Sequence, residues 1–398
     1  MDVFVYTFLL LASALFFGHL MMRLKQPQIV GEIIGGIIVG PVLLFILPRI
    51  FVPEGHAILR FFSHEEASDL MKAVIDFSGV FLMLGAGLET DLSDLLKVGK
   101  EAIFTAIFGV IIPFSLGYFV SIKMLNLSTT ASLYIAASVS ITAVALSVAT
   151  LIQIGKLNTK VGMTIIGAAV VDDIIGIIIL SVLTSIGKTG EIPHVSFLIK
   201  LLFIAILFVS LSIILGPLLG RFVFSRVEKL SLNERLSIVL LWVFIFSMLA
   251  HMAGLHLIIG AFFGGLTVRN FLRKGEIESI EKWIWGFFAP LFFSWTGFSI
   301  VLSGEAVGLS LLAIVVVAFV GKIFGGGFGA FLSGMPFKKS LVVGIGMNAR
   351  AAVELVVANI ALNQGIVNRP IYTSIVFMAM ITSITTPMLL KTFAEKYV

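Results

Sequence analysis

Two adjacent carboxylates, Asp172 and Asp173, stand near the middle of an otherwise apolar run that extends from Val161 to Ile186. A carboxylate at the centre of a bilayer costs about 2.5–3.5 kcal/mol on insertion scales, so ionisable residues at that depth are typical of functional sites. Because successive positions of a helix differ by about 100° around its axis, the two side chains must face different surroundings. We therefore predict that one carboxylate faces a cavity and carries a cation or a proton, while the other meets a cationic partner.

Lys322 is the predicted cationic partner. It lies near the centre of a second apolar run, residues 308–333, too deep for its side chain to reach the membrane surface. A lysine at that depth must pair with a carboxylate or lose its proton. The glycines that follow, Gly325–Gly327, would let neighbouring helix backbones pack closely. An ion pair with a purely structural role is the alternative interpretation.

A second group of charged residues follows later in the chain. Arg350 and Glu354 are four residues apart, which places them on one face of a continuous helix, and an intrahelical ion pair is the simplest interpretation. Just upstream, Gly344, Gly346 and Asn348 indicate local unwinding. Backbone carbonyls freed by such unwinding coordinate ions in several transporters.

Four further polar residues are candidates for the same site. Ser140 and Thr142 lie in the apolar run 129–154 and form the predicted counterpart of the unwound segment, although hydroxyls within helices often bond only the preceding turn. Glu32 and Asp76 lie near the ends of two other apolar runs. They belong either to an ion pathway or to the membrane interface.

The composition indicates a membrane protein. Of the 398 residues, 59% are hydrophobic and only 12% are charged, whereas soluble domains are about half apolar and a quarter charged. Long continuous apolar runs predict helices and not an alternating β-barrel. Cysteine is absent, which excludes disulfides and thiolate metal sites. The net charge of +5 is spread over short loops, so we expect no nucleic-acid partner. No nucleotide motif or catalytic triad is present, and we expect neither an enzyme nor a cofactor.

About 20 apolar residues span a bilayer. On that basis we predict an all-α polytopic protein with about thirteen transmembrane helices, at residues 2–22, 29–48, 71–88, 101–122, 129–154, 161–187, 196–225, 234–252, 255–270, 283–302, 308–333, 340–362 and 371–390. We expect the first to be retained and no soluble domain to follow the last. Most of the 27 lysine and arginine residues would lie in inner loops if the N-terminus were outside, which predicts an external N-terminus and a cytoplasmic C-terminus.

An odd helix count permits two inverted repeats, helices 1–6 and 8–13, joined by helix 7. Transporters built this way place the substrate site between the repeats near the bilayer midplane. Residues 49–70 form the longest predicted connection and could hold a small amphipathic segment. Glu89, Asp91 and Asp94 are predicted to form a solvated inner loop.

Several of these segments resemble a known family. Residues 26–41, QPQIVGEIIGGIIVGP, and residues 79–92, GVFLMLGAGLETDL, are similar to signature segments of the monovalent cation:proton antiporter-2 family. The segments SITAVALS (140–147) and VVDDI (170–174), then Lys322 and the Arg350/Glu354 segment, occur in the same order as in that family. The resemblance covers nearly the whole chain.

The resemblance implies a sodium/proton antiporter with the NapA/NhaA-like fold, in which helices 5 and 12 are partly unwound and cross. Electrogenic members carry an Asp-Asp pair and a lysine, whereas electroneutral relatives usually have Asn-Asp and Kef-type potassium systems Gln-Asp. By this analogy Asp173 and Asp172 bind sodium transiently, with Thr142 and Ser140 nearby, and Asp172 parts from Lys322 when sodium enters. The family's Pro-Arg-Gly in helix 12 is replaced by residues 349–351, Ala-Arg-Ala, so we expect the break further upstream, at residues 344–348.

The resemblance also implies two domains and a homodimer in a prokaryotic plasma membrane. A core domain, about residues 101–187 and 308–393, would move like an elevator against a dimerisation domain, about residues 1–95 and 196–302, exchanging cytoplasmic sodium or lithium for external protons. Potassium/proton or mixed-cation exchange is the first alternative. A sodium-coupled organic solute symporter is the second, although it would not need Lys322. A passive channel or a membrane scaffold is the third.

Overall fold

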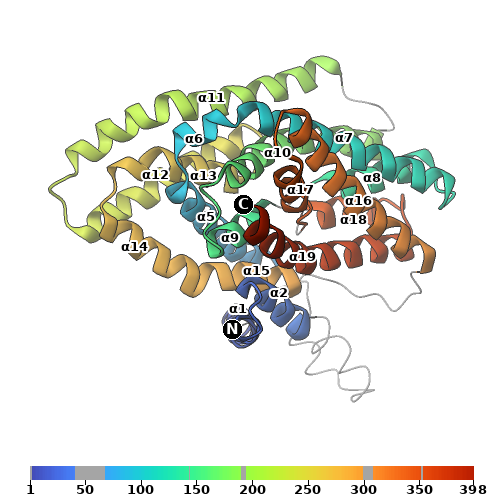
Figure 1. The fold of residues 1–398 in the computed structure, drawn as a ribbon, viewed down its shortest axis with the longest axis horizontal. Coiled ribbons are helices and arrows are strands. Elements are labelled where there is room, and N and C mark those ends of the chain that lie inside the picture. Colours follow the sequence, from blue (N-terminus) through green and yellow to red (C-terminus); the bar gives the residue numbers. More distant parts are fainter. Residues whose placement is uncertain (1, 41–67, 143, 190–193, 299–307, 351–352) are drawn as a thin grey trace.

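The computed structural model describes residues 2–40, 68–142, 144–189, 194–298, 308–350 and 353–398 (Figure 1). Within these ranges the chain is helical and contains no strand. The elements are α1 (Asp2–Arg23), α2 (Gln28–Ile37), α5 (Ser68–Glu89), α6 (Leu92–Lys97), α7 (Gly99–Lys123), α8 (Thr129–Ser140), α9 (Val144–Gln153), α10 (Lys160–Thr189), α11 (Val195–Arg226), α12 (Leu232–Met252), α13 (Leu257–Val268), the 3₁₀ turn η2 (Arg269–Phe271), α14 (Lys274–Trp283), the π-helical turn η3 (Ile284–Phe288), α15 (Ala289–Phe298), α16 (Gly308–Leu332), α17 (Phe337–Gly346), α18 (Val353–Asn363) and α19 (Arg369–Tyr397).

Eight helical segments of the described residues are long and apolar enough to cross a membrane, which confirms the predicted class of all-helical membrane protein. The predicted spans 129–154 and 340–362 each comprise two helices, α8 with α9 and α17 with α18. Residues 41–48 of the second predicted span, the connection up to residue 67 and residues 299–302 lie outside the described residues.

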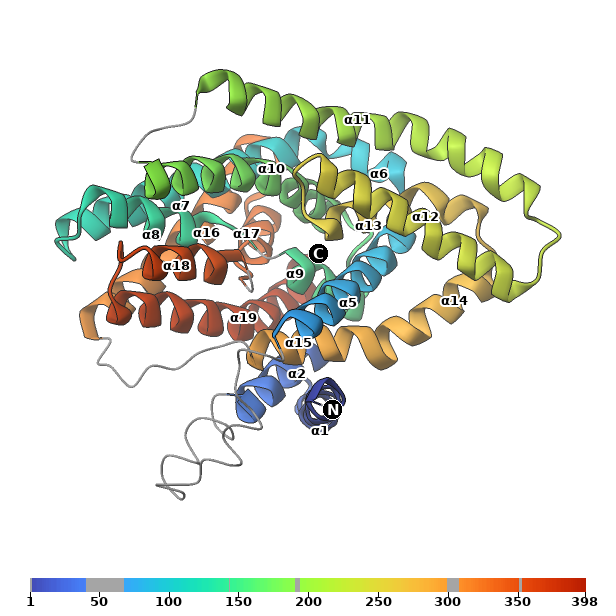
Figure 2. The same cartoon turned by 180° about the vertical axis from the view of Figure 1, so that it is seen from behind.

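Several long helices expose an apolar surface, as expected for helices that face lipid. The clearest case is α11, which has 32 residues and runs along one edge of the molecule in both views (Figures 1 and 2). Side chains such as Phe203, Ile214 and Leu218 project from it and are more than half exposed. In water such a face would be unfavourable, whereas acyl chains cover it without cost.

Glycines hold α16 close to two neighbouring helices. A methyl group added at Gly325 would lie 2.6 Å from the Phe108 carbonyl oxygen of α7, and one added at Gly329 would lie 2.2 Å from the Phe104 carbonyl oxygen. The two glycines after Gly325 face α17 instead. The predicted close packing around these glycines is confirmed, and it fixes the helix that carries Lys322.

Two helices are interrupted in mid-course, and their breaks face each other. One break separates α8 from α9 and the other separates α17 from α18. The Ser147 hydroxyl of α9 donates a hydrogen bond of 2.5 Å to the Gly346 carbonyl oxygen at the end of α17.

The second break lies later than predicted. Gly344 and Gly346 are helical, and the described part of the break comprises residues 347–350. A methyl group at Gly344 would lie 2.1 Å from the Ile323 carbonyl oxygen of α16. The glycines therefore serve close packing between helices, which is why their presence did not mark the point of unwinding.

A buried ion pair joins α12 to α14. The Arg235 guanidinium donates to both carboxylate oxygens of Glu276, and both side chains are at most 2% exposed. Arg235 also donates to the carbonyl oxygens of Val227, at 3.2 Å, and Phe271, at 3.0 Å. Glu276 accepts a further bond of 2.8 Å from the Arg273 backbone N–H. Together these bonds fix the short polar helix α14 against the α11–α12 connection.

The predicted solvated loop at residues 89–94 is only partly solvated. Asp91 and Asp94 are accessible, and Asp91 caps the start of α6 and contacts Arg269 at 3.4 Å. Glu89 ends α5 and is half-buried. Burial and, to a smaller extent, the charge of Glu281 raise the pKa of its carboxyl, the charge of Arg269 opposes them, and the resulting pKa is about 7. The solvated-loop prediction was therefore wrong for Glu89, because α14 packs beside it.

Candidate functional site

The two buried charges predicted to pair lie together at the centre of the molecule. Lys322 Nζ of α16 is 3.1 Å from Asp172 Oδ1 of α10, and both side chains are at most 1% exposed. Lys322 Nζ also donates to the Ser140 carbonyl oxygen at the end of α8. The second oxygen of Asp172 accepts a 3.1 Å bond from the backbone N–H of Thr142, which lies within the first break. One ion pair thus connects three segments, including the unwound one.

Arg350 supplies the second positive charge at the end of α8. It donates to the Ser138 carbonyl oxygen at 2.8 Å, to that of Ile141 at 3.1 Å, and to that of Val139. The last carbonyls of a helix have no partners within it, and in a membrane no water replaces them. The end of α8 also carries the negative pole of the helix dipole, which a cation stabilises. Arg350 and Lys322 therefore stabilise the break by donating hydrogen bonds to the otherwise unpaired carbonyl oxygens at the end of α8.

The expectation that Arg350 and Glu354 share one helix was wrong. Arg350 lies in the non-helical segment before α18, so the four-residue spacing does not place the two side chains on one helix face. Glu354 is fully buried in the first turn of α18. The positive pole of that helix favours a carboxylate there.

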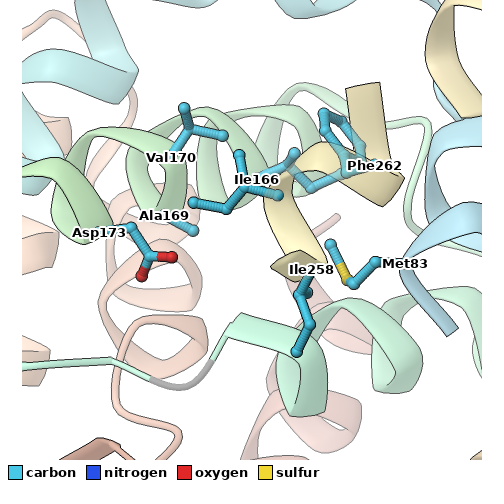
Figure 3. Close-up of a pocket in the computed structure, with 8 residues that line it drawn as sticks. Met83, Ile166, Ala169, Val170, Asp173, Ile258 and Phe262 are labelled. Atoms are coloured by element: carbon cyan, nitrogen blue, oxygen red, sulfur yellow. The ribbon is translucent and has the colours of Figure 1, made fainter. Parts of the chain in front are cut away.

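Asp173 faces a different environment from Asp172. It is half-buried and lines a cavity between α10 and the pair α5 and α13. In Figure 3 its carboxylate lies across the cavity from Met83 of α5. The other lining residues are apolar: Ile166, Ala169, Val170, Ile258, Ile259 and Phe262. The two aspartates therefore face different surroundings, as their adjacency in a helix requires, and Asp173 is the one at the cavity.

Ser140 and Thr142 contribute mainly through their backbone. The Ser140 hydroxyl donates to the Ala137 carbonyl oxygen of its own helix at 3.0 Å, and only its carbonyl reaches Lys322. Thr142 holds Asp172 through its N–H. Among the described residues its buried hydroxyl has no hydrogen-bond partner. That oxygen is the available side-chain ligand of the first break.

The structure places the other predicted residues apart from the Lys322 pair. Glu32 is fully buried in α2 and accepts a 2.9 Å bond from the Gln28 side chain. Asp76 is exposed on α5. Asn348 is buried in the second break, and its Nδ2 donates to Thr386 Oγ1 at 3.2 Å.

Three residues of the site were not predicted from the sequence. They are Ser147 of α9 and Ser383 and Thr386 of α19; the Ser383 hydroxyl donates to the Arg350 carbonyl oxygen. The segment 380–386, MITSITT, contains four hydroxyl residues within the otherwise apolar stretch 375–390 of α19. This concentration was the available signal, but hydroxyls that bond their own helix give the same pattern.

Comparison with known proteins agrees with this arrangement. Residues 8–396 match the family described as "Sodium/hydrogen exchanger, transmembrane". The chain is 31% identical to the Na(+)/H(+)-K(+) antiporter GerN of Bacillus cereus, covering 98% of this chain and 95% of GerN. It is 30% identical to the high-affinity Na(+)/H(+) antiporter NhaS3 of Synechocystis, covering 95% and 87%.

A solved structure shows the same fold. The sodium proton antiporter MjNhaP1 of Methanocaldococcus jannaschii superimposes with a TM-score of 0.65 at 17% identity, covering 100% of this chain and 99% of MjNhaP1. The family-level resemblance drawn from the sequence is thus confirmed. The chain belongs to the transmembrane sodium/hydrogen exchanger family, and it is a membrane transporter and not an enzyme.

Proposed function

We propose that this protein exchanges sodium for protons across a cell membrane, with Asp173 as the group that carries either ion. The observation that supports this most directly is the pairing of Asp172 with Lys322 beside a second carboxylate that faces a cavity. The pair is neutral as a unit, so Asp173 contributes the one negative charge that a proton or a cation can balance. Relatives named as Na(+)/H(+) antiporters support the same assignment.

Competition for Asp173 makes the transport an exchange. An ionised carboxylate without a counter-charge is costly at bilayer depth, so the empty site does not cross the membrane. With a proton or a sodium ion bound, that cost falls and the site can change sides. Each crossing therefore requires one of the two loads, which prevents a leak of either ion alone.

The lysine allows the exchange to move charge. When sodium binds both aspartates, Asp172 parts from Lys322, and the lysine releases its proton as Asp173 releases its own. Two protons then enter for each sodium ion that leaves, and one net charge crosses the membrane. A membrane potential of 100 mV contributes about 2.3 kcal/mol to that step. Export of cytoplasmic sodium then follows from an inside-negative potential.

The proposal includes an elevator movement. The cavity at Asp173 lies where α10 faces α5 and α13, which is the boundary between the proposed core (about 101–187 and 308–393) and the proposed scaffold (about 1–95 and 196–302). The two facing breaks fit the crossed helices of an NhaA-like fold with inverted repeats. We further propose a homodimer with an external N-terminus and a cytoplasmic C-terminus in the plasma membrane of a prokaryote.

Reconstitution in proteoliposomes tests the proposal. A pH dye and a voltage dye are recorded together while sodium, lithium, potassium or a panel of organic solutes is added. Asp173→Asn is expected to abolish cation-driven proton flux. Asp94→Asn, at an accessible carboxylate paired with Lys97, is the matched control and should leave the flux intact. Undiminished flux in Asp173→Asn would refute the site assignment.

Potassium is the second candidate cation. GerN, which is similar over nearly the whole chain, is named as an Na(+)/H(+)-K(+) antiporter. In the same vesicles, proton release driven by potassium at concentrations comparable to sodium would extend the activity to both ions. Flux driven only by an organic solute together with sodium would instead establish symport.

A further inference from the structure

Helix α19 presents two hydroxyl groups to the second break. The Ser383 hydroxyl donates to the Arg350 carbonyl oxygen, and Thr386 Oγ1 accepts a bond of 3.2 Å from Asn348 Nδ2. Ser383 and Thr386 are three residues apart and so lie on one face of the helix. Both are at most 2% exposed. The segment 347–350 is thus held from its α19 side by side chains alone.

The contact with Thr386 determines which atom of the Asn348 amide has no hydrogen-bond partner among the described residues. Because Nδ2 is engaged by Thr386, Oδ1 points away from it, and Oδ1 has no hydrogen-bond partner among the described residues. Asn348 is only 1% exposed. Buried acceptors of this kind are nearly always paired in proteins, so an unpaired one at a functional site calls for a ligand.

The position of Asn348 suggests which ligand. Arg350, two residues after Asn348, donates to the Ile141 carbonyl oxygen at the end of α8. The residue after Ile141 is Thr142, whose backbone N–H donates to Asp172. Thr142, in the first break, carries a second buried side-chain oxygen, its hydroxyl, that has no hydrogen-bond partner among the described residues. Neutral carbonyl-type oxygens replace the water shell of a monovalent cation in selective sites.

We propose that Asn348 Oδ1 is a ligand of the dehydrated cation during transport, and that Ser383 and Thr386 are positioning residues that fix its orientation. This inference rests on the proposed function. It adds an uncharged ligand from the second break to the carboxylates of α10, and it gives α19 a role in selecting the cation. Transfer of the cation from water to the site then depends on how rigidly the amide is held.

Thr386→Val tests the inference, because it keeps the shape of the side chain and removes the acceptor. Loss of residues that orient a metal ligand typically lowers affinity about 10–100-fold. We therefore expect the half-saturating sodium concentration in proteoliposomes to rise about tenfold or more, with a smaller change in maximal rate and a changed ratio of lithium, sodium and potassium. Thr386→Ser, which restores the hydroxyl, is expected to recover the wild-type values.

Thr382→Val is the matched control. Thr382 is fully buried on the same helix, but its hydroxyl bonds only the carbonyls of Met378 and Ala379 in its own turn. It should leave the half-saturating concentration unchanged. Asn348→Ala should reproduce the effect of Thr386→Val, and the double variant should add nothing further. Sodium-dependent thermal stabilisation of the purified protein gives the same comparison without transport.

The inference is overturned if Thr386→Val keeps the wild-type half-saturation and ion ratio, or if Thr386→Ser and Thr382→Val are impaired to the same degree as Thr386→Val. Failure of the proposed function looks different. In that case Asp173→Asn retains flux whatever the state of residue 386. Loss of flux in Asp173→Asn together with an unaltered Thr386→Val rejects only the role of Asn348.

Discussion

Two buried ion pairs in this protein are built in opposite ways. Arg235 and Glu276 share two contacts, and each makes further bonds to the backbone, so the pair is enclosed by fixed partners. Lys322 and Asp172 share a single contact of 3.1 Å. Their remaining bonds go to Ser140 and Thr142 at a helix break, and the neighbouring Asp173 faces a cavity.

The difference separates a structural pair from one that can open. A guanidinium is always protonated and binds a carboxylate through two parallel bonds, whereas a buried lysine can lose its proton. Removing one partner of a fully enclosed pair leaves an uncompensated charge. Lys322 shares only one contact with Asp172, so the proposed cycle requires fewer bonds to break there than at the Arg235–Glu276 pair. Burial alone therefore does not distinguish the two pairs; the number and kind of their partners do.

Arg235→Met, at the structural pair, should cause the largest loss of folding stability. It leaves the Glu276 charge buried, which typically costs about 3–5 kcal/mol. The melting temperature of the purified protein in detergent should fall sharply, and the double variant Arg235→Met/Glu276→Leu should recover most of the loss. Lys97→Met, in an exposed pair with Asp94, is the control and should have little effect. Equal stability of the single and double variants would contradict the assignment.

Lys322→Met should affect stability less and transport more. Lys322 and Asp172 share a single contact and Asp172 retains its bond from the Thr142 N–H, so we expect a loss of about 1–3 kcal/mol, the cost of a buried group that loses one partner. The voltage signal that accompanies sodium/proton exchange in proteoliposomes should disappear. If the voltage coupling of Lys322→Met equals that of the wild type, the lysine has no part in charge movement.

Glu89→Gln should produce the smallest effect, and one that depends on pH. The pKa of Glu89 is raised to about 7 from an ordinary value of 4.5, so the folded protein binds this proton more tightly than the unfolded chain. The resulting stabilisation is lost as the pH rises from about 4.5 to about 7. Glu89→Gln should therefore melt at a higher temperature than the wild type at pH 8 and at the same temperature at pH 4. An equal difference at both pH values would show that Glu89 is not the titrating group.

Glu276 provides the opposite case on the neighbouring helix. Burial acts to raise the pKa of its carboxyl, but hydrogen bonds from Arg235 and the Arg273 backbone, together with both charges, hold it below its ordinary value. Its stabilisation is present above about pH 4.5 and is lost as the pH falls further. The contribution of Glu276 to stability therefore changes below about pH 4.5, whereas that of Glu89 changes between about pH 4.5 and 7.

Much of the site could be predicted from the sequence because charge in an apolar run is costly and must be compensated. Asp172, Asp173 and Lys322 could be identified in this way, and their adjacency implied two different surroundings. The helical membrane class followed from composition. The exact number of spans does not follow, because interrupted helices and short helices such as α6 and α14 depend on local contacts.

The contacts of the second break could not be predicted. The spacing of Arg350 and Glu354 suggested a pair within one helix only on the assumption of a continuous helix, whereas Arg350 lies in the non-helical segment 347–350. Gly344 and Gly346 were interpreted as signs of local unwinding, although they allow close contact with Ile323 of α16 and with Ile165 of α10, respectively. The partners Ser147, Ser383 and Thr386 lie 199, 33 and 38 residues from the groups they bind. Such pairings depend on how helices are arranged and not on local sequence.

The glycine contacts between α7 and α16 fix the position of the helix that carries Lys322. Because backbone touches backbone at Gly325 and Gly329, neither helix can slide or roll without a collision of main-chain atoms. The Lys322 ammonium group is therefore held on two tightly packed helices, and in the proposed elevator movement α7 and α16 would move as one unit. A methyl group added at Gly325 or Gly329 should therefore displace the Lys322 ammonium group as effectively as a substitution beside Asp172 or Asp173.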